Sequence, residues 1–413
     1  MNIGLFDPFR MQDIPDTVED YLMDSINSKA NCCAFNRRGS FLAVGSQQGQ
    51  ISIWDFDTKS IGRLLISHKQ CVNYVCWTRN GKNLLSVSND GSLVLWDLAD
   101  SKVEKKLEME LALLFVQVHP RDSRYALICS SGIGVPLLVN LESENLTYEP
   151  IFDPSSYKGD LNLQGVMTAS FNRKGTKIYI GDSHGMVNVV DWKSRAYEKS
   201  FKGSSASVKG FQFSRNGKMV LVNSNDKVLR LYSLPQQQEG VIGEYSLLRD
   251  FSDNVNRVQW KSFGFSYNNE YVYGGMSHKS IQSILVWNTS GGIVKGLEGP
   301  KEGLLDVTWH PYRPIIVSLS YSGIIYIWSC YYTENWSSFA PDFQELEENE
   351  EYIEREDEFD HKSDDDDEKD KKQNGQSNSK DNEEDVDILS IDKMDEYSSD
   401  EEEEILVISS IPE

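Results

Sequence analysis

Residues 68–97 read HKQCVNYVCWTRNGKNLLSVSNDGSLVLWD. This stretch holds three short apolar segments, separated by Asn80-Gly81 and by Asp90-Gly91. Asn-Gly and Asp-Gly favour tight reversals of the chain, while the segments between them are rich in residues that favour strands. The stretch is therefore predicted to fold as a hairpin followed by a third strand that contains Trp96.

The same pattern occurs seven times along the chain. An apolar or aromatic residue before a turn is followed by a bulky residue near the end of an apolar strand, 19 residues later in five units and 21 or 22 later in the other two. From one strand end to the next the steps are 42, 43, 51, 42, 55 and 41 residues. A period near forty residues with four strands per unit predicts a β-propeller of seven blades. The pairs are Phe35 with Trp54, Trp77 with Trp96, Val118 with Val139, Phe171 with Val190, Phe213 with Tyr232, Phe265 with Trp287 and Trp309 with Trp328.

The two ends of the repeat array predict how the ring closes. The first unit begins with its first strand and the seventh ends with its third, so the seventh blade lacks a fourth strand. The segment around Thr17 to Ser28 is expected to supply it, which leaves no exposed sheet edge. Residues 1–30 are thus assigned to closure and residues 31–330 to the propeller. Pro136 falls inside the expected third strand of the third blade and predicts an irregular blade there, because proline cannot donate a ladder bond.

The unit at 68–97 resembles the WD40 repeat family. In that family a histidine, a strand serine, a turn aspartate and a strand tryptophan form a structural tetrad joined by hydrogen bonds. The resemblance implies that His68, Asp90 and Trp96 form this tetrad with Ser86 or Ser88, and we assign Ser88. The fold class expected is all-β, a seven-bladed WD40 β-propeller followed by a disordered acidic tail.

The formal net charge of −23 is concentrated near the C-terminus. From Asp342 onward there are 31 acidic and 7 basic residues, whereas residues 1–341 hold 33 acidic and 34 basic residues. Few aromatics and runs such as Asp364 to Asp367 and Glu401 to Glu404 leave too little apolar surface to offset the entropy of ordering. We therefore expect residues 362–413 to be disordered alone, after a partner-binding segment at 331–361.

Targeting and disulfide signals are missing from the sequence. The N-terminus has no basic region followed by an apolar core, and no apolar run approaches the length of about 18 residues that spans a bilayer. The cysteines lie mostly in or beside apolar strands and lack paired Cys-x-x-Cys spacing, which indicates reduced core residues of an intracellular protein. They are Cys32, Cys33, Cys71, Cys76, Cys129 and Cys330.

The sequence holds no candidate active site. It has no Walker-type phosphate loop, no H-E-x-x-H and no G-x-S-x-G. His68 fits the tetrad, His119 and His310 precede prolines in turns, and the other three histidines lie in turns or in the tail. Metal ligands should cluster, and these residues do not obviously do so. We expect no enzyme activity, no metal, no cofactor and no small-molecule substrate.

The segment after the last blade resembles a known family. It contains Asn335-Trp336-Ser337-Ser338-Phe339-Ala340-Pro341-Asp342-Phe343 and the acidic block from Glu350 to Asp360. These residues, together with Leu304-Leu305-Asp306-Val307-Thr308-Trp309-His310-Pro311 and His119-Pro120-Arg121-Asp122, are similar to the retinoblastoma-binding protein 5 family. Members of that family are WD-repeat subunits of the COMPASS and MLL-type histone H3 lysine 4 methyltransferase complexes. The resemblance covers essentially the whole chain and implies a non-catalytic scaffold in the nucleus.

The resemblance also implies partners for the tail. Apolar anchors and acids would contact the catalytic SET-domain subunit and a SPRY-domain subunit, through Trp336, Phe339, Phe343, Glu354, Glu356, Asp357, Glu358, Phe359 and Asp360. A short motif at 383–392 would bind a second WD-repeat subunit, one that also binds arginine peptides, through Glu384, Val386, Asp387 and Ile388. Alternating acids and β-branched residues let an extended strand place Val386 and Ile388 on one face.

Four basic residues resemble those through which the family touches nucleosomal DNA. Lys227 and Lys279 lie in or beside turns between second and third strands, while Arg257 and Lys301 lie near connections between blades. Both kinds of loop emerge at the same end of a propeller, so the four should gather on one rim. Scattered solvated charge is the alternative for them. For the whole chain the alternatives are a WD-repeat histone chaperone or a ubiquitin-ligase adaptor.

Overall fold

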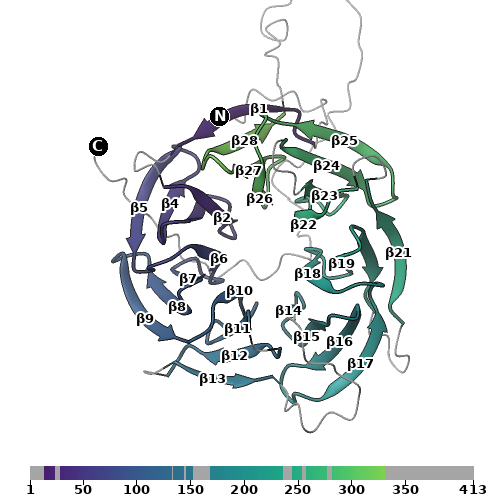
Figure 1. Ribbon diagram of the computed structural model, residues 1–413, viewed down its shortest axis with the longest axis horizontal. Coiled ribbons are helices and arrows are strands. Elements are labelled where there is room, and N and C mark those ends of the chain that lie inside the picture. Colours follow the sequence, from purple (N-terminus) through teal and green to yellow (C-terminus); the bar gives the residue numbers. More distant parts are fainter. Residues whose placement is uncertain are drawn as a thin grey trace, which may run out of the picture. The chain divides into compact units, whose positions relative to one another are not determined.

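The computed structural model describes residues 14–23, 28–132, 134–143, 146–151, 168–235, 244–253, 257–276 and 281–330. The chain divides into two units, residues 1–332 with 403–413 and residues 333–402, and all of the described residues belong to the first unit. Within it, seven four-stranded antiparallel sheets are arranged as the blades of a ring (Figure 1). The prediction of a seven-bladed propeller is confirmed.

Each blade is a meander of consecutive strands, except at the point of closure. Blades 1 to 3 contain β2 (Ala30–Phe35), β3 (Phe41–Ser46), β4 (Gln50–Asp55), β5 (Ser60–Ile66); β6 (Val72–Trp77), β7 (Asn83–Ser88), β8 (Ser92–Asp97), β9 (Lys102–Glu108); β10 (Leu113–Val118), β11 (Tyr125–Ser130), β12 (Leu137–Asn140) and β13 (Thr147–Pro150). Blades 4 to 6 contain β14 (Thr168–Phe171), β15 (Lys177–Gly181), β16 (Met186–Asp191), β17 (Tyr197–Lys202); β18 (Val208–Phe213), β19 (Met219–Ser224), β20 (Leu229–Ser233), β21 (Ser246–Phe251); β22 (Trp260–Phe265), β23 (Tyr271–Met276), β24 (Ser283–Asn288) and β25 (Ile293–Glu298). Blade 7 contains β26 (Leu304–Trp309), β27 (Ile316–Ser320), β28 (Ile325–Ser329) and β1 (Thr17–Leu22).

The repeated residue pairs form rows across the blades. In blade 2, Trp77 pairs with Leu84, and Leu84 pairs with Trp96 on the next strand. Leu84 is 0% exposed and Trp96 is 1% exposed, and both belong to a core cluster that also contains Ile51 and Ile53 of blade 1. The core therefore lies between neighbouring blades. The two residues of a pair such as Trp77 and Trp96 therefore lie on the first and third strands of a blade, on either side of one residue of the second strand. This arrangement accounts for the spacing of 19 residues.

Closure of the ring uses both strand pairing and a buried carboxylate. β1 pairs antiparallel with β28, with Tyr21 opposite Tyr326. On the inner strands, the Cys33 amide donates a hydrogen bond of 3.0 Å to the carboxylate of Asp306. Burial raises the pKa of Asp306, although this bond opposes the rise. The first and seventh blades are thus joined at the inner strands as well as by β1, the fourth strand of the seventh blade.

Pro136 does not lie inside a strand, so that prediction was wrong. It directly precedes β12, and its carbonyl accepts a hydrogen bond of 3.2 Å from the amide of Ile151. Because proline lacks the donor but keeps the acceptor, it fits at the start of a strand. Both β12 and β13 are only four residues long.

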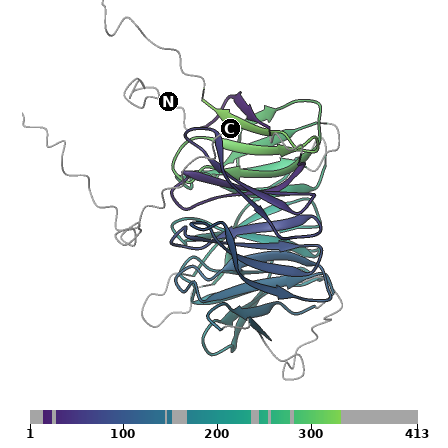
Figure 2. The same cartoon turned by 90° about the vertical axis from the view of Figure 1, so that its left-hand side faces the viewer.

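The antiparallel blades give the ring two rims, seen edge-on in Figure 2. The connection rim carries the links between blades and the turns between second and third strands. The hairpin rim carries the turns between first and second strands and those between third and fourth strands. In the described part of the chain, no helix is long and apolar enough to cross a membrane.

Candidate functional site

The histidine before the second blade is the centre of a buried polar network. His68 Nε2 lies 2.6 Å from Ser86 Oγ, which also accepts a hydrogen bond of 2.8 Å from Trp96 Nε1. On the other side, His68 Nδ1 lies 2.6 Å from Ser92 Oγ, which donates to Asp90 Oδ1 at 2.5 Å. Each of these polar atoms has a partner, which is the condition for burying polar groups without a large cost.

The assignment of Ser88 to this network was wrong. Ser88 ends β7, and its hydroxyl donates instead to the carbonyl of Gln70 at 3.1 Å. The indole of Trp96 reaches Ser86, which lies ten residues before it, and Trp328 reaches Ser318 at the same spacing in blade 7. This repeated spacing was present in the sequence and could have identified Ser86. Ser92 links His68 to Asp90 in space but follows both in the sequence. It was missed because no spacing in the sequence marks a serine for this position.

The two His-Pro turns also use their histidines structurally. His119 Nε2 lies 2.8 Å from the carbonyl of Gly175 in the following blade, and His310 Nε2 lies 3.2 Å from that of Gly39. Gly39 and Gly175 have positive φ, and a Cβ on either would meet the imidazole of the neighbouring blade. Burial lowers the pKa of His68 and of His310 to about 4, so both rings are neutral at physiological pH.

The lowered pKa values of His68 and His310 predict a loss of stability in mild acid. An unfolded histidine has a pKa near 6.5, so between about pH 6.5 and pH 4 the unfolded chain binds more protons than the folded one. The free energy of unfolding should be undiminished above this window and fall within it, by about 2–3 kcal/mol per histidine at about pH 4.5. Urea unfolding of the wild type and of His310→Gln at about pH 7 and about pH 4.5 measures it. The variant should show the smaller change with pH, and an equal change in both proteins would contradict the assignment.

Lys227 occupies a strained position on the connection rim. It lies five residues before Tyr232, where blades 1, 2, 4 and 7 have glycine, and its φ is +69°. A left-handed conformation costs a residue with a Cβ about 1 kcal/mol. The carbonyl of Lys227 accepts a hydrogen bond of 2.9 Å from Trp260 Nε1, which fixes the turn against the next blade.

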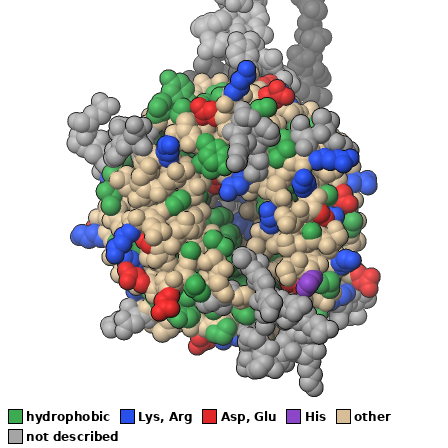
Figure 3. All heavy atoms as spheres, viewed as in Figure 1, with side chains coloured by type: hydrophobic (Ala, Val, Ile, Leu, Met, Phe, Trp, Pro, Cys, Tyr) green, Lys and Arg blue, Asp and Glu red, His purple; other side chains and the backbone are tan. Residues whose placement is uncertain are grey.

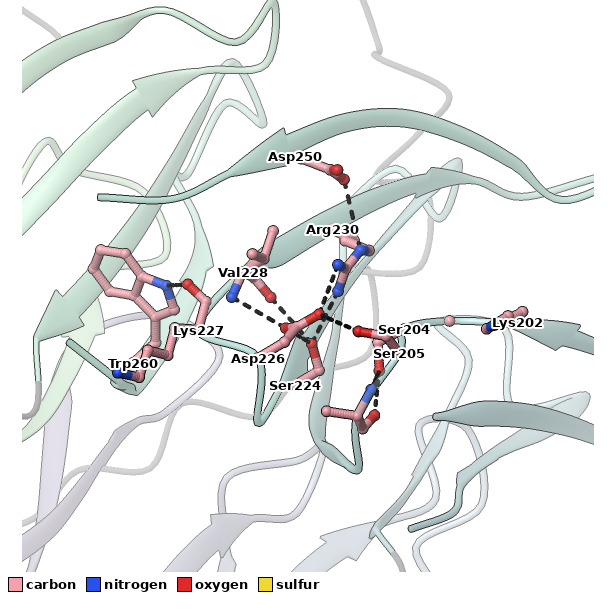
Figure 4. Close-up of polar contacts among 12 residues, drawn as sticks. Lys202, Ser204, Ser205, Ser224, Asp226, Lys227, Val228, Arg230, Asp250 and Trp260 are labelled. Atoms are coloured by element: carbon pink, nitrogen blue, oxygen red, sulfur yellow. Dashed lines mark hydrogen bonds and ion pairs between the residues drawn. The ribbon is translucent and has the colours of Figure 1, made fainter. Parts of the chain in front are cut away.

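Asp226, the residue before Lys227, has several polar partners of its own (Figure 4). Asp226 forms an ion pair of 2.6 Å with Arg230, and it also accepts hydrogen bonds from Ser224 and from the amide of Val228. These bonds and the charge of Arg230 lower the pKa of Asp226 although burial opposes the shift. Asp226 is therefore ionised, and its carboxylate is held by Arg230, which also lies 3.8 Å from Asp250.

Two more of the predicted DNA-contacting residues lie on the same rim. Arg257 precedes β22 with a φ of +47°, and Lys301 lies between β25 and β26; both are exposed. Lys279 lies outside the described residues. Figure 3 shows Lys and Arg side chains gathered over the side of the ring formed by β17 to β25.

Sequence reasoning missed three basic residues in this region. Lys202 ends β17, while Lys209 and Lys261 are the second residues of the innermost strands β18 and β22. All three are exposed. The pKa of Lys209 is lowered by desolvation and by the charge of Lys261, and the two lysines hold the same position on the first strands of neighbouring blades. The shared position in two first strands was a signal in the sequence, although only the closed ring brings them together.

The predicted partner-binding residues all lie outside the described residues. They are Trp336, Phe339, Phe343, Glu354, Glu356, Asp357, Glu358, Phe359, Asp360, Glu384, Val386, Asp387 and Ile388. Within the described ranges, no three His, Cys, Asp or Glu side chains form a group that could hold a metal. The six cysteines are free thiols, and burial raises the pKa of Cys32, Cys33 and Cys129.

A ring of seven four-stranded blades with a buried His-Ser-Trp network defines a WD-repeat β-propeller. In agreement, the family model "WD domain, G-beta repeat" matches residues 196–233 and 291–329. A model described as the second β-propeller of WD repeat-containing protein 75 matches residues 14–152.

Comparison of the whole chain identifies the family. The chain is 52% identical to "Retinoblastoma-binding-like protein E" of Dictyostelium discoideum, over 100% of this chain and 84% of that protein. It is 30% identical to "COMPASS component SWD1" of Saccharomyces cerevisiae, over 87% of each. The crystal structure of the Cps50 (Swd1) β-propeller domain of Myceliophthora thermophila superposes with a TM-score of 0.69 at 26% identity, covering 77% of this chain and 100% of that one. The chain belongs to the retinoblastoma-binding protein 5 family.

Proposed function

We propose that this chain is a non-catalytic scaffold subunit of a nuclear histone H3 lysine 4 methyltransferase complex. The observation that carries this proposal is the similarity to a COMPASS component over 87% of both chains, which extends beyond the propeller. Affinity purification tests the proposal against its alternatives. SET-, SPRY- and WD-repeat subunits should be recovered together, whereas histones alone would indicate a chaperone and a cullin complex would indicate a ligase adaptor.

Within that complex, the segment after β28 would connect the subunits. Trp336, Phe339 and Phe343 provide apolar anchors in a sequence that turns acidic, a composition suited to ordering on a partner. The acids from Glu354 to Asp360 would form charge-assisted bonds with basic side chains of the SPRY-domain subunit. Binding several subunits at once would favour the active conformation of the SET domain by a shift in population.

The propeller itself would contact nucleosomal DNA through the connection rim. Lys227, Arg257 and Lys301 are exposed there, and Lys227 keeps a conformation that glycine would adopt at lower cost. Strained residues often mark functional sites. Lys202, Lys209 and Lys261 add positive charge along the same side of the ring.

Replacing Lys227, Arg257, Lys279 and Lys301 with Glu should therefore weaken nucleosome binding. For every DNA phosphate that the variant no longer neutralises, the slope of log affinity against log salt concentration should fall by about 0.9. Methylation of a free histone peptide should be unchanged. Lys227→Glu alone should show part of this loss, and its matched control is Lys102→Glu, since Lys102 is exposed on the outer strand β9. An equal loss of activity on peptide and nucleosome would refute the role in DNA binding.

A further inference from the structure

The junction between blades 5 and 6 holds two basic residues in an unusual backbone conformation. On the connection rim, Lys227 (φ +69°) and Arg257 (φ +47°) are the only described residues other than glycine that have a positive φ. Lys227 belongs to the turn between β19 and β20, and Arg257 belongs to the connection that leads into β22. Both side chains are exposed. Because a residue with a Cβ is strained in this conformation, the junction presents these two charges at a cost in stability.

The junction also differs from its equivalents in the space that it leaves. In blades 1, 2 and 4 a Cβ on the glycine at the position of Lys227 would collide with a backbone carbonyl of the next connection. The carbonyls concerned are those of His68, Met109 and Ser204. Blade 5 accommodates a side chain at this position. The connection that carries Arg257 therefore takes a path that the other three connections do not take.

Three hydrogen bonds join the turn of blade 5 to the start of blade 6. Trp260 Nε1 donates to the carbonyl of Lys227 at 2.9 Å (Figure 4). Gln259 Nε2 donates to the carbonyl of Ser224 at 3.3 Å, and Asn223 Nδ2 donates to the carbonyl of Trp260 at 3.3 Å. The turn that carries Lys227 is therefore fixed to the first residues of the neighbouring blade.

Trp260 is itself a departure from the repeat. It is the first residue of an innermost strand, and five other innermost strands begin with a buried aliphatic residue. The larger ring fits because Gly274 lies against it, where a Cβ would meet the indole. An aliphatic side chain fills this position elsewhere, so burial alone does not require an indole. The indole adds an N–H group, and that group is bonded to Lys227. The five aliphatic residues are Ala30, Val72, Leu113, Val208 and Leu304.

We propose that Trp260 is a positioning residue that holds Lys227 and Arg257 as one unit for contact with the DNA backbone. This inference rests on the DNA contacts proposed above. The indole bonds to the main chain of Lys227, so it fixes the point at which that side chain leaves the turn. It stands three residues after Arg257 and thus anchors both residues at one junction. Basic residues that are fixed before binding lose less conformational freedom when they contact phosphates.

Nucleosome affinity of the full chain tests this proposal. Trp260→Phe keeps an aromatic ring in the core but removes the indole N–H, and it should weaken binding by about threefold to tenfold, the effect of losing one hydrogen bond. The slope of log affinity against log salt concentration should fall with it, by up to about 0.9 for each phosphate no longer neutralised. In the background Lys227→Gln with Arg257→Gln, the same change should cause no further loss, because Trp260 acts through these two residues.

Trp54→Phe is the matched control. Trp54 Nε1 donates to Ser52 Oγ at 3.0 Å within blade 1, so this variant also loses a buried indole hydrogen bond but in a different blade. It should lower the urea midpoint and change neither the affinity nor its salt dependence. If Trp260→Phe fails to fold, Gln259→Leu removes the neighbouring bond to blade 5 from a half-buried side chain. This variant should show the same pattern with a smaller loss.

The outcomes separate this inference from the DNA contacts on which it rests. Full affinity in Trp260→Phe, beside a loss in the variant Lys227→Gln with Arg257→Gln, would overturn the inference and leave the DNA contacts standing. Equal losses from Trp260→Phe in the wild type and in that background would also overturn it, since the tryptophan would then act only through the stability of the propeller. Full affinity in the variant Lys227→Gln with Arg257→Gln would refute the contacts of these two residues, and the inference with them.

Discussion

Replacing Glu354, Glu356, Glu358 and Asp360 with Ala is expected to reduce binding to the SPRY-domain subunit by more than about 100-fold. Four carboxylates that each form a charge-assisted bond would contribute about 1.5 kcal/mol or more apiece, and a loss of about 3 kcal/mol already corresponds to about 100-fold. Methylation should fall with binding, while the unfolding midpoint of the propeller stays unchanged because these residues lie beyond β28. Pull-down at physiological salt and a methylation assay measure the two effects.

A control for this variant separates a specific motif from the general charge of the tail. Asp364, Asp365, Asp366 and Asp367 replaced by Ala remove the same number of carboxylates a few residues further along. This variant should bind nearly as well as the wild type. If both variants lose binding equally, the tail acts only through its net charge and the acidic block has no special role.

The change Val386→Glu with Ile388→Glu is expected to abolish binding to the second WD-repeat subunit. In an extended strand these side chains lie on one face, so both charges would enter an apolar cleft without a partner. Calorimetry should show an affinity loss of more than about 100-fold. Val407→Glu with Ile408→Glu places the same charges near the C-terminus and should leave binding intact. Wild-type affinity in the first double variant would rule the assignment out.

Local sequence rules predicted most of the fold because each blade repeats the same physical pattern. Trp77 and Trp96 mark one row of a blade, and turn residues such as Asn80-Gly81 mark where the chain reverses. The closing strand could be located because the array begins and ends within a blade. Pro136 was misplaced by one residue, since composition does not reveal where a strand begins.

The polar sites were harder to predict because they depend on the closed ring. Ser86 and Ser88 are both strand serines, and the Trp96 indole selects Ser86, at the ten-residue spacing that Ser318 and Trp328 repeat in blade 7. Lys209 and Lys261 are 52 residues apart in sequence and become neighbours through two adjacent blades. The left-handed backbone of Lys227 could have been predicted from the sequence, because this residue stands where four other units have glycine.

Reconstitution of the methyltransferase on nucleosomes tests the central claim most directly. The SET-, SPRY- and second WD-repeat subunits are assembled with and without this chain, and the rate of histone H3 lysine 4 methylation is compared. If the chain is a scaffold that holds the SET domain in its active conformation, its omission should lower the rate by at least about tenfold. This corresponds to a rise of about 1.4 kcal/mol in the activation free energy. The chain alone should show no methylation. Equal rates with and without it would contradict the account.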